Sequence, residues 1–218
     1  MGQVSNLKIN MFHIYFYRVS KRIFRAIYLV YSRTVVWLKF RFNNVKVGSG
    51  MKSFGIPLVD VWLGSSFSIG NNFMMCNGKY FNVIGRQQSC CFVVGNNGLL
   101  TIGDNVGISD SAIICHKRIS IGDNVVIGGN VVIYDTDFHS LDKEQRADPV
   151  LDLQHTKCVP VIIENDVFIG AHSTILKGVT IGEGAIIGAC SVVTRSVPKN
   201  EIWAGNPAKF IKSIVKTS

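Results

Sequence analysis

The sequence predicts an all-β chain, a parallel β-helix of six-residue repeats with a helical segment before it and one long loop inside it. Aliphatic residues recur every six positions, and the recurrence stops once and then resumes. The longest run consists of Ile163, Ile169, Ile175, Ile181, Ile187 and Val193. An α-helix repeats every 3.6 residues and a half-buried strand every two. A period of six therefore indicates a short strand with one inward aliphatic residue, followed by a corner.

The same period appears in three earlier segments. They are Ile121, Ile127 and Ile133; Ile102, Ile108 and Ile114; and a weaker run of Leu63, Ile69, Met75 and Phe81. Gly, Asn or Asp follows most of these positions, and we expect these residues at the corners because they tolerate positive φ. Three strands then close a triangular coil, and successive coils pair in parallel about 4.7–4.9 Å apart.

Residues 1–46 are predicted to form a basic amphipathic helical segment, since they hold nine Lys or Arg and no Asp or Glu. One helical stripe is apolar: Phe12, Phe16, Val19, Ile23, Ile27 and Val30. Arg18, Lys21, Arg22 and Arg25 cluster roughly opposite. The stripe either lies on an anionic membrane surface or packs on the end of the β-helix or at a subunit contact. The rest of the chain is neutral, so no nucleic-acid partner is expected.

The repeat halts after Ile133 and resumes near Val161, so that residues 134–160 loop out of the coils. A long insertion in a compact domain is usually functional. This one places His139 behind two carboxylates, Asp135 and Asp137. Nearby carboxylates fix the tautomer of a neutral imidazole, as a general base requires. Asp135, Asp137 or a backbone carbonyl is expected to orient the ring.

The chain therefore divides into the helical segment 1–46, a β-helix domain over 47–201 with its loop at 134–160, and a closing tail over 202–218. The six cysteines form no C-x-x-C pair, so no metal site is expected. Their number and spacing favour a reducing, cytoplasmic setting. Cys115 and Cys190 lie within repeats and are expected to be small buried thiols.

Two motifs add a resemblance to a known family. The segment from Ile121 to His139 ends in Asp-Thr-Asp-Phe-His, and the tail from Ala204 to Lys212 reads Ala-Gly-Asn-Pro-Ala-Lys-Phe-Ile-Lys. From about Leu63 to Lys212 the chain resembles the hexapeptide-repeat O-acetyltransferases, the galactoside and maltose acetyltransferases. It is most similar among them to bacterial polysaccharide acetyltransferases of O-antigen and capsule.

The resemblance implies a left-handed β-helix and an acetyl-CoA-dependent enzyme. In such an enzyme His139 deprotonates an acceptor hydroxyl that attacks the acetyl group directly. It further implies a homotrimer with active sites between subunits. The acceptor it implies is a sugar hydroxyl of a surface-polysaccharide precursor, which a lipid could carry. N-acetylation of an amino-sugar nucleotide on the same fold and a catalytically silent solenoid are the alternatives.

By the same resemblance, coenzyme contacts fall at Ala171 and Ala189 along the pantetheine arm, and at Thr194, Arg195, Lys209 and Lys212 near the nucleotide. Lys209 and Lys212 stand where galactoside-type members often carry Arg, which keeps the charge but loses bidentate geometry. On the acceptor side, Ser109 and Asp110 align with a contact segment whose Asn is not matched. Corner polarity alone also explains these two residues. His116 is expected to line the same cleft.

Overall fold

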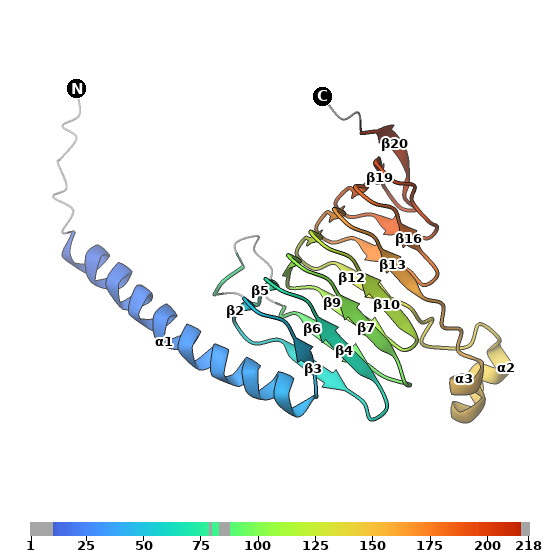
Figure 1. Ribbon diagram of the computed structural model, residues 1–218, viewed down its shortest axis with the longest axis horizontal. Helices are drawn as coiled ribbons and strands as arrows, with labels where there is room; N and C mark the ends of the chain where they lie inside the picture. Colours follow the sequence, from blue (N-terminus) through green and yellow to red (C-terminus); the bar gives the residue numbers. More distant parts are fainter. Residues whose placement is uncertain (1–10, 79, 83–87, 215–218) are drawn as a thin grey trace, which may run out of the picture.

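The computed structural model describes residues 11–78, 80–82 and 88–214. The predicted parallel β-helix is confirmed: three parallel sheets form the sides of a stack of triangular coils (Figure 1). Sheet 1 contains β1 (Lys46–Val47), β4 (Ser66–Ile69), β7 (Leu99–Ile102), β10 (Arg118–Ile121), β13 (Val161–Ile163) and β16 (Thr180–Ile181). Sheet 3 contains β3 (Leu58–Val61), β6 (Cys91–Val94), β9 (Ala112–Cys115), β12 (Val132–Tyr134), β15 (Thr174–Ile175) and β18 (Val192–Val193).

Sheet 2 contains β2 (Lys52–Phe54), β5 (Met74–Cys76), β8 (Gly107–Ser109), β11 (Val126–Ile127), β14 (Phe168–Ile169), β17 (Ile186–Ile187), β19 (Glu201–Ala204) and β20 (Lys209–Ser213). Its last pair is antiparallel, and this hairpin closes the C-terminal end of the stack. Figure 1 shows β19 and β20 at this end of the stack.

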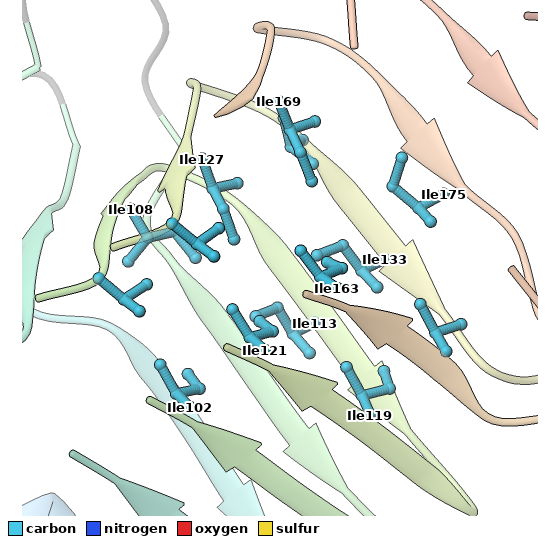
Figure 2. Close-up of a cluster of buried hydrophobic side chains, with 14 of the residues drawn as sticks. Ile102, Ile108, Ile113, Ile119, Ile121, Ile127, Ile133, Ile163, Ile169 and Ile175 are labelled. Atoms are coloured by element: carbon cyan, nitrogen blue, oxygen red, sulfur yellow. The ribbon is translucent and has the colours of Figure 1, made fainter. Parts of the chain in front are cut away.

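The core is a column of aliphatic side chains inside the triangle (Figure 2). Ile121 pairs with Ile163 in the next coil, and Ile163 pairs with Ile181 in the coil after that. The expectation of one inward residue per strand was too low. Most strands of the coils have a second buried side chain two positions earlier, such as Val161 before Ile163, because side chains of a strand alternate between its two faces.

Three of the predicted inward residues lie elsewhere. Leu63 is fully exposed, because two extra residues lengthen the turn after β3. Ile114 faces outward while Ile113 and Cys115 are buried, because the corner before β9 holds one extra residue. Phe81 lies outside the strands and packs on Phe54. The period of six is thus interrupted where corners differ in length.

Each corner of the triangle has its own chemistry. The asparagine corner, from sheet 1 to sheet 2, takes positive φ at Asn105 and Asn124, and the side-chain amide of Asn105 donates to Oδ1 of Asn124 at 3.1 Å. The glycine that begins this corner has a different role. A Cβ on Gly122 would lie 2.9 Å from the amide N of Asn165 in the next coil, so Gly allows close stacking.

The other two edges are the alanine corner, from sheet 2 to sheet 3, and the loop corner, from sheet 3 to sheet 1. At the alanine corner the positive φ falls on His172 and Cys190. Cys190 is exposed there, contrary to the buried thiol expected, whereas Cys115 is buried. The long loop emerges at the loop corner.

The helix α1 (Phe12–Phe42) precedes the first coil and extends away from it (Figure 1). Its C-terminal part packs through Ser32, Val36 and Phe40, and the Phe40 ring lies 6.3 Å from that of Phe67. Among the described residues, no helix combines the length and apolarity needed to cross a membrane.

The apolar stripe of α1 does not pack on the β-helix within one chain. All of its residues are exposed: Phe12, Phe16, Val19, Ile23, Ile27 and Val30. A different face makes the side contact, through Phe24 and Tyr28 against Tyr80 and Phe81. Packing of the stripe on the end of the chain's own β-helix is therefore wrong, while an anionic membrane surface and a subunit contact remain as its explanations.

Candidate active site

The inserted loop is a hairpin that stands on the loop corner and carries two short helices, α2 (Lys143–Ala147) and α3 (Pro149–His155), at its tip (Figure 1). At its base Thr136 pairs with Cys158 in antiparallel fashion. The amide of Val159 donates to the carbonyl of Asp135 at 2.8 Å. Both ends of the loop are thereby fixed to the rigid coils, so the residues near its base have defined positions.

The helix α3 begins with a strong local signal. The Asp148 side chain accepts hydrogen bonds from the amides of Val150 and Leu151, and Pro149 occupies the first turn. This start sets the rotation of the helix. Asp152, in the first turn, consequently points back at the residues that follow the first strand of the loop.

His139 is oriented by Asp152. Its Nδ1 lies 2.7 Å from Oδ2 of Asp152, while Oδ1 of the same carboxylate accepts from the amide of Ser140 at 2.6 Å. A carboxylate only accepts, so Nδ1 carries the hydrogen and the neutral ring keeps its lone pair on Nε2. The hydrogen bond from His139, then that from Ser140, holds the pKa of Asp152 below its usual value of 3.8.

The exposure of the two partners suits a base. The His139 side chain is 66% exposed and Asp152 only 14%. The reactive edge of the ring is therefore accessible while its anchor is shielded. Nε2 can take a proton from a hydroxyl that approaches from outside the loop.

The expectation that Asp135 or Asp137 orients His139 was wrong. Asp135 is buried and accepts hydrogen bonds from the amides of His116, Lys117 and Arg118 in the coil below. Asp137 Oδ1 lies 2.6 Å from Nζ of Lys177 in the coil above. Both carboxylates therefore fasten the base of the loop to neighbouring coils. Sequence analysis missed Asp152, for which the Asp-Pro helix start was the available signal.

Phe138 directly precedes the candidate base, and its aromatic ring packs against two other rings. It contacts the Tyr134 ring at 5.0 Å and the His116 ring at 6.1 Å, both edge-on. The structure thus brings His116, predicted to line the cleft, next to the loop that carries His139. The Nδ1 of His116 is also 3.3 Å from the side-chain amide of Asn96.

The residues predicted to contact coenzyme fall on two different edges. Thr194 and Arg195 follow β18 at the loop corner, two coils above the His139 loop. Ala171 and Ala189 follow β14 and β17 at the alanine corner, where the amide of Cys190 donates to the Ala171 carbonyl at 2.9 Å. One chain therefore does not gather the six residues into one site.

The two lysines of this set lie on the closing hairpin. Lys209 and Lys212 are exposed on β20, where Lys209 pairs with Ala204 of β19. The guanidinium of Arg195 lies over the Trp203 ring at 5.4 Å, which fixes one cation at this end of the stack.

Asp110 supports the alternative in which corner polarity has a structural role. It is buried, and it accepts hydrogen bonds from the amide of Gly78 and from the side chain of Asn82. Burial raises its pKa above 3.8. The backbone carbonyl of Ser109 accepts from the Ser111 hydroxyl at 2.7 Å. These bonds tie the segment after β5 to the alanine corner, away from the His139 loop.

A β-helix of hexapeptide coils with an oriented histidine in its inserted loop defines a hexapeptide-repeat transferase. A model of "bacterial transferase hexapeptide (six repeats)" matches residues 160–195, and one of the "hexapeptide repeat of succinyl-transferase" matches residues 99–135. WbbJ of Escherichia coli, provisionally named a lipopolysaccharide biosynthesis O-acetyl transferase, is 31% identical over 154 residues, 67% of this chain and 71% of WbbJ. The chain therefore belongs to the hexapeptide-repeat acetyltransferase family.

Other relatives are matched over shorter lengths. The galactoside O-acetyltransferase of Escherichia coli is 40% identical over 102 residues, 47% of each chain, so this chain spans about half of that enzyme. A solved structure of a mutant of AntD, an N-acyltransferase from Bacillus cereus, is similar with a TM-score of 0.61 and 26% identity over 78% of this chain and 84% of AntD. It holds dTDP-4-amino-4,6-dideoxyglucose and coenzyme A.

A hexapeptide-repeat acetyltransferase of Vibrio cholerae shares the fold, with a TM-score of 0.53 and 22% identity over 90% of this chain and 92% of that one. The left-handed β-helix expected from the resemblance is consistent with these neighbours and confirmed as the fold class.

Proposed function

We propose that this chain is an O-acetyltransferase that moves an acetyl group from acetyl-CoA to a sugar hydroxyl, with His139 as general base. The observation that carries the proposal is the His139–Asp152 pair. Nδ1 of His139 lies 2.7 Å from Oδ2 of Asp152, and the other edge of the ring is accessible. The relation to WbbJ and to galactoside O-acetyltransferase supports a hydroxyl oxygen as the nucleophile of the acceptor.

In the proposed reaction, Nε2 of His139 takes the proton of the acceptor hydroxyl as its oxygen bonds to the thioester carbonyl carbon. The tetrahedral oxyanion is stabilised by N–H donors, and it collapses as the carbon–sulfur bond breaks. The proton on Nε2 passes to the departing thiolate. Asp152 stabilises the transient imidazolium and holds the ring in the tautomer that starts the cycle. General-base assistance of this kind is worth about 10²–10⁴-fold.

Acetyl-CoA is proposed to lie in a groove between two chains of a homotrimer. This arrangement would bring two groups together across the groove: Ala171, Ala189, Lys209 and Lys212 of one chain, and Thr194 and Arg195 of the next. The division of these residues between two corners supports it, because a coenzyme on one chain would reach only one group. Cations at the C-terminal end suit the nucleotide phosphates. Closed cyclic symmetry is the usual solution for such assemblies.

Surface-polysaccharide synthesis is the setting we propose, with a saccharide acceptor that a lipid could carry. The exposed apolar stripe of α1 and the basic residues on its other faces fit a helix lying on an anionic membrane surface. Such a site would be at the cytoplasmic face, where acetyl-CoA is available. The chain would attach there peripherally.

N-acetylation of an amino-sugar nucleotide is the second candidate. It is supported by AntD, whose structure holds an amino-sugar nucleotide together with coenzyme A. The same base would serve an amine, so acceptor comparison and not the base decides between the two. Rates of acetyl transfer to dTDP-4-amino-4,6-dideoxyglucose and to neutral saccharides, measured under the same conditions, distinguish the two functions.

The test of the proposal is release of free thiol from acetyl-CoA with candidate acceptors, for the wild type and His139→Ala. We expect the variant to lose about 10²–10⁴-fold in kcat with coenzyme binding retained. His155→Ala is the matched control, since that histidine is in the same loop and its Nδ1 lies 2.8 Å from the carbonyl oxygen of Leu151 in its own helix. A His139→Ala enzyme with the wild-type rate would contradict the assignment.

A further inference from the structure

Below the His139 loop, the loop corner carries a line of aromatic rings that continues toward the N-terminal end of the stack. The Phe138 ring contacts the His116 ring at 6.1 Å, and the His116 ring contacts that of Trp62 at 6.0 Å. These rings come from coils that sequence separates widely but stacking brings to one edge. Trp62 is 46% and Phe138 43% exposed, so both present ring surface to the outside.

The indole of Trp62 is held rigidly. Its Nε1 donates to Oδ2 of Asp60 at 3.2 Å. Its other side packs against Gly95 of the next coil, where an added Cβ would lie 3.0 Å from Cε3 of the indole. A larger residue at 95 would displace the ring. An exposed Trp fixed at two points loses little entropy when a ligand binds it.

Phe138 is held in an unusual backbone conformation. Its φ of 63° is in the left-handed region, which side chains other than Gly, Asn and Asp rarely adopt. The amide of Phe138 donates to Oγ1 of Thr136 at 3.1 Å, which secures that turn. Strain of this kind persists where the surroundings over-determine it, and it clusters at ligand sites. The Phe138 side chain is 43% exposed at this turn, and Phe138 is the residue directly before the candidate base.

Polar groups accompany the rings. Asp60 lies at the Trp62 end, and Asn96 lies beside His116 with its side-chain amide 3.3 Å from the imidazole. Flat apolar faces with a few fixed carboxylate and amide groups are the chemistry that recognises sugar rings: C–H groups pack on the aromatic face and hydroxyls bond the polar rim. A lipid or apolar peptide would not need the rim.

We propose that Phe138, His116 and Trp62 form an acceptor platform for an extended saccharide, with the acetylated residue at His139 and further sugar units lying toward Trp62. This inference rests on the proposed function. The platform runs from the coil of β12 down to that of β3, and its ring centroids are separated by successive steps of 6.1 Å and 6.0 Å. That length exceeds one pyranose ring, so the site favours an oligosaccharide or polysaccharide over a single sugar or sugar nucleotide.

The two ends of the loop corner have opposite expected roles. The proposed coenzyme contacts Thr194 and Arg195 lie above the His139 loop, and the platform lies below it. An acceptor that extends from His139 toward the N-terminal end of the stack therefore does not compete with acetyl-CoA for space. Both substrates meet at Nε2 of His139.

The test measures kcat and KM for acetyl transfer to neutral gluco-, galacto- and manno-saccharides of one to four units. We expect the wild-type KM to fall with acceptor length. Trp62→Ala should raise KM for the longest acceptors about tenfold and leave the shortest within about twofold, and Trp62→Phe, which keeps a ring, should recover part of the loss. The matched control is Leu63→Ala, because Leu63 is the next residue and fully exposed.

Three outcomes would overturn the platform: a wild-type KM independent of length, no transfer to any saccharide of the panel, or equal losses for short and long acceptors in Trp62→Ala. A change in oligomeric mass of Trp62→Ala by native mass spectrometry would assign the ring to a subunit contact instead. The His139→Ala enzyme separates the two proposals. If it loses transfer while length has no effect, the base stands and the platform fails.

Discussion

The pairing of Asp152 with His139 gives the sharpest prediction about the chemistry. Without the carboxylate, the imidazole is free to sample three staggered χ1 wells, two χ2 orientations and two tautomers, about a dozen states of which one is productive. We therefore expect Asp152→Ala to lower kcat/KM about tenfold, well short of the effect of removing the base. In a His139→Ala background the same substitution should change the rate by less than about twofold, because the two residues act as a unit.

A loop control distinguishes orientation of the His139 ring from damage to the loop. The carboxylate itself stays ionised in such assays: its pKa is lowered below 3.8, and the contribution of its hydrogen bonds is lost only as pH falls through that lowered value. Gln145→Ala, which frees the Ser140 hydroxyl but not the ring, is the loop control.

The reasoning would be refuted by additive losses in the Asp152 and His139 double variant, or by an equal loss in Gln145→Ala. Asp152→Glu should recover part of the rate, since a longer carboxylate can still accept from Nδ1. A rate in Asp152→Glu below that of Asp152→Ala would likewise argue against orientation by a carboxylate.

Two predictions concern the frame and its membrane contact. Gly170→Ala should lower the free energy of unfolding by about 1–3 kcal/mol in thermal or urea denaturation, because its Cβ would lie 2.5 Å from the amide N of Ala189, whereas Gly107→Ala, with open space around the added Cβ, should be nearly neutral; equal effects would contradict close stacking as the reason for Gly. For α1, Ile23→Glu should reduce flotation of the protein with anionic phospholipid vesicles, while Tyr17→Glu, which adds the same charge on another exposed face, should reduce it much less; equal flotation of both variants and the wild type would exclude the stripe as a membrane contact.

The fold could be read from the sequence because one period explains it. Ile163 and Ile181 pair in adjacent coils because they are 18 residues apart, which is three repeats and therefore one full coil. The errors arose where a corner holds extra residues, as before β9, since a period gives no warning of a change in corner length. Outward-facing Ile114 is the result.

The candidate site was only partly accessible to the same reasoning. His139 could be found because the repeat stops just before it. Asp152 could not be paired with it from spacing alone, because the loop folds back through α3. Asp135 and Asp137 are the carboxylates nearest to His139 in sequence, but Asp135 binds the coil below and Asp137 the coil above.

Trp62 illustrates why a solenoid can hide a site from sequence inspection. It is 54 positions before His116, yet only one coil lies between the two, and their rings touch. Because every coil returns the chain to the same three edges, residues that act together need only share an edge and not a neighbourhood in sequence. In our proposals the loop corner aligns a coenzyme end, a base and an aromatic platform in this way. An acceptor on that platform would extend toward the coil against which α1 packs, and hence toward the surface on which we expect α1 to lie.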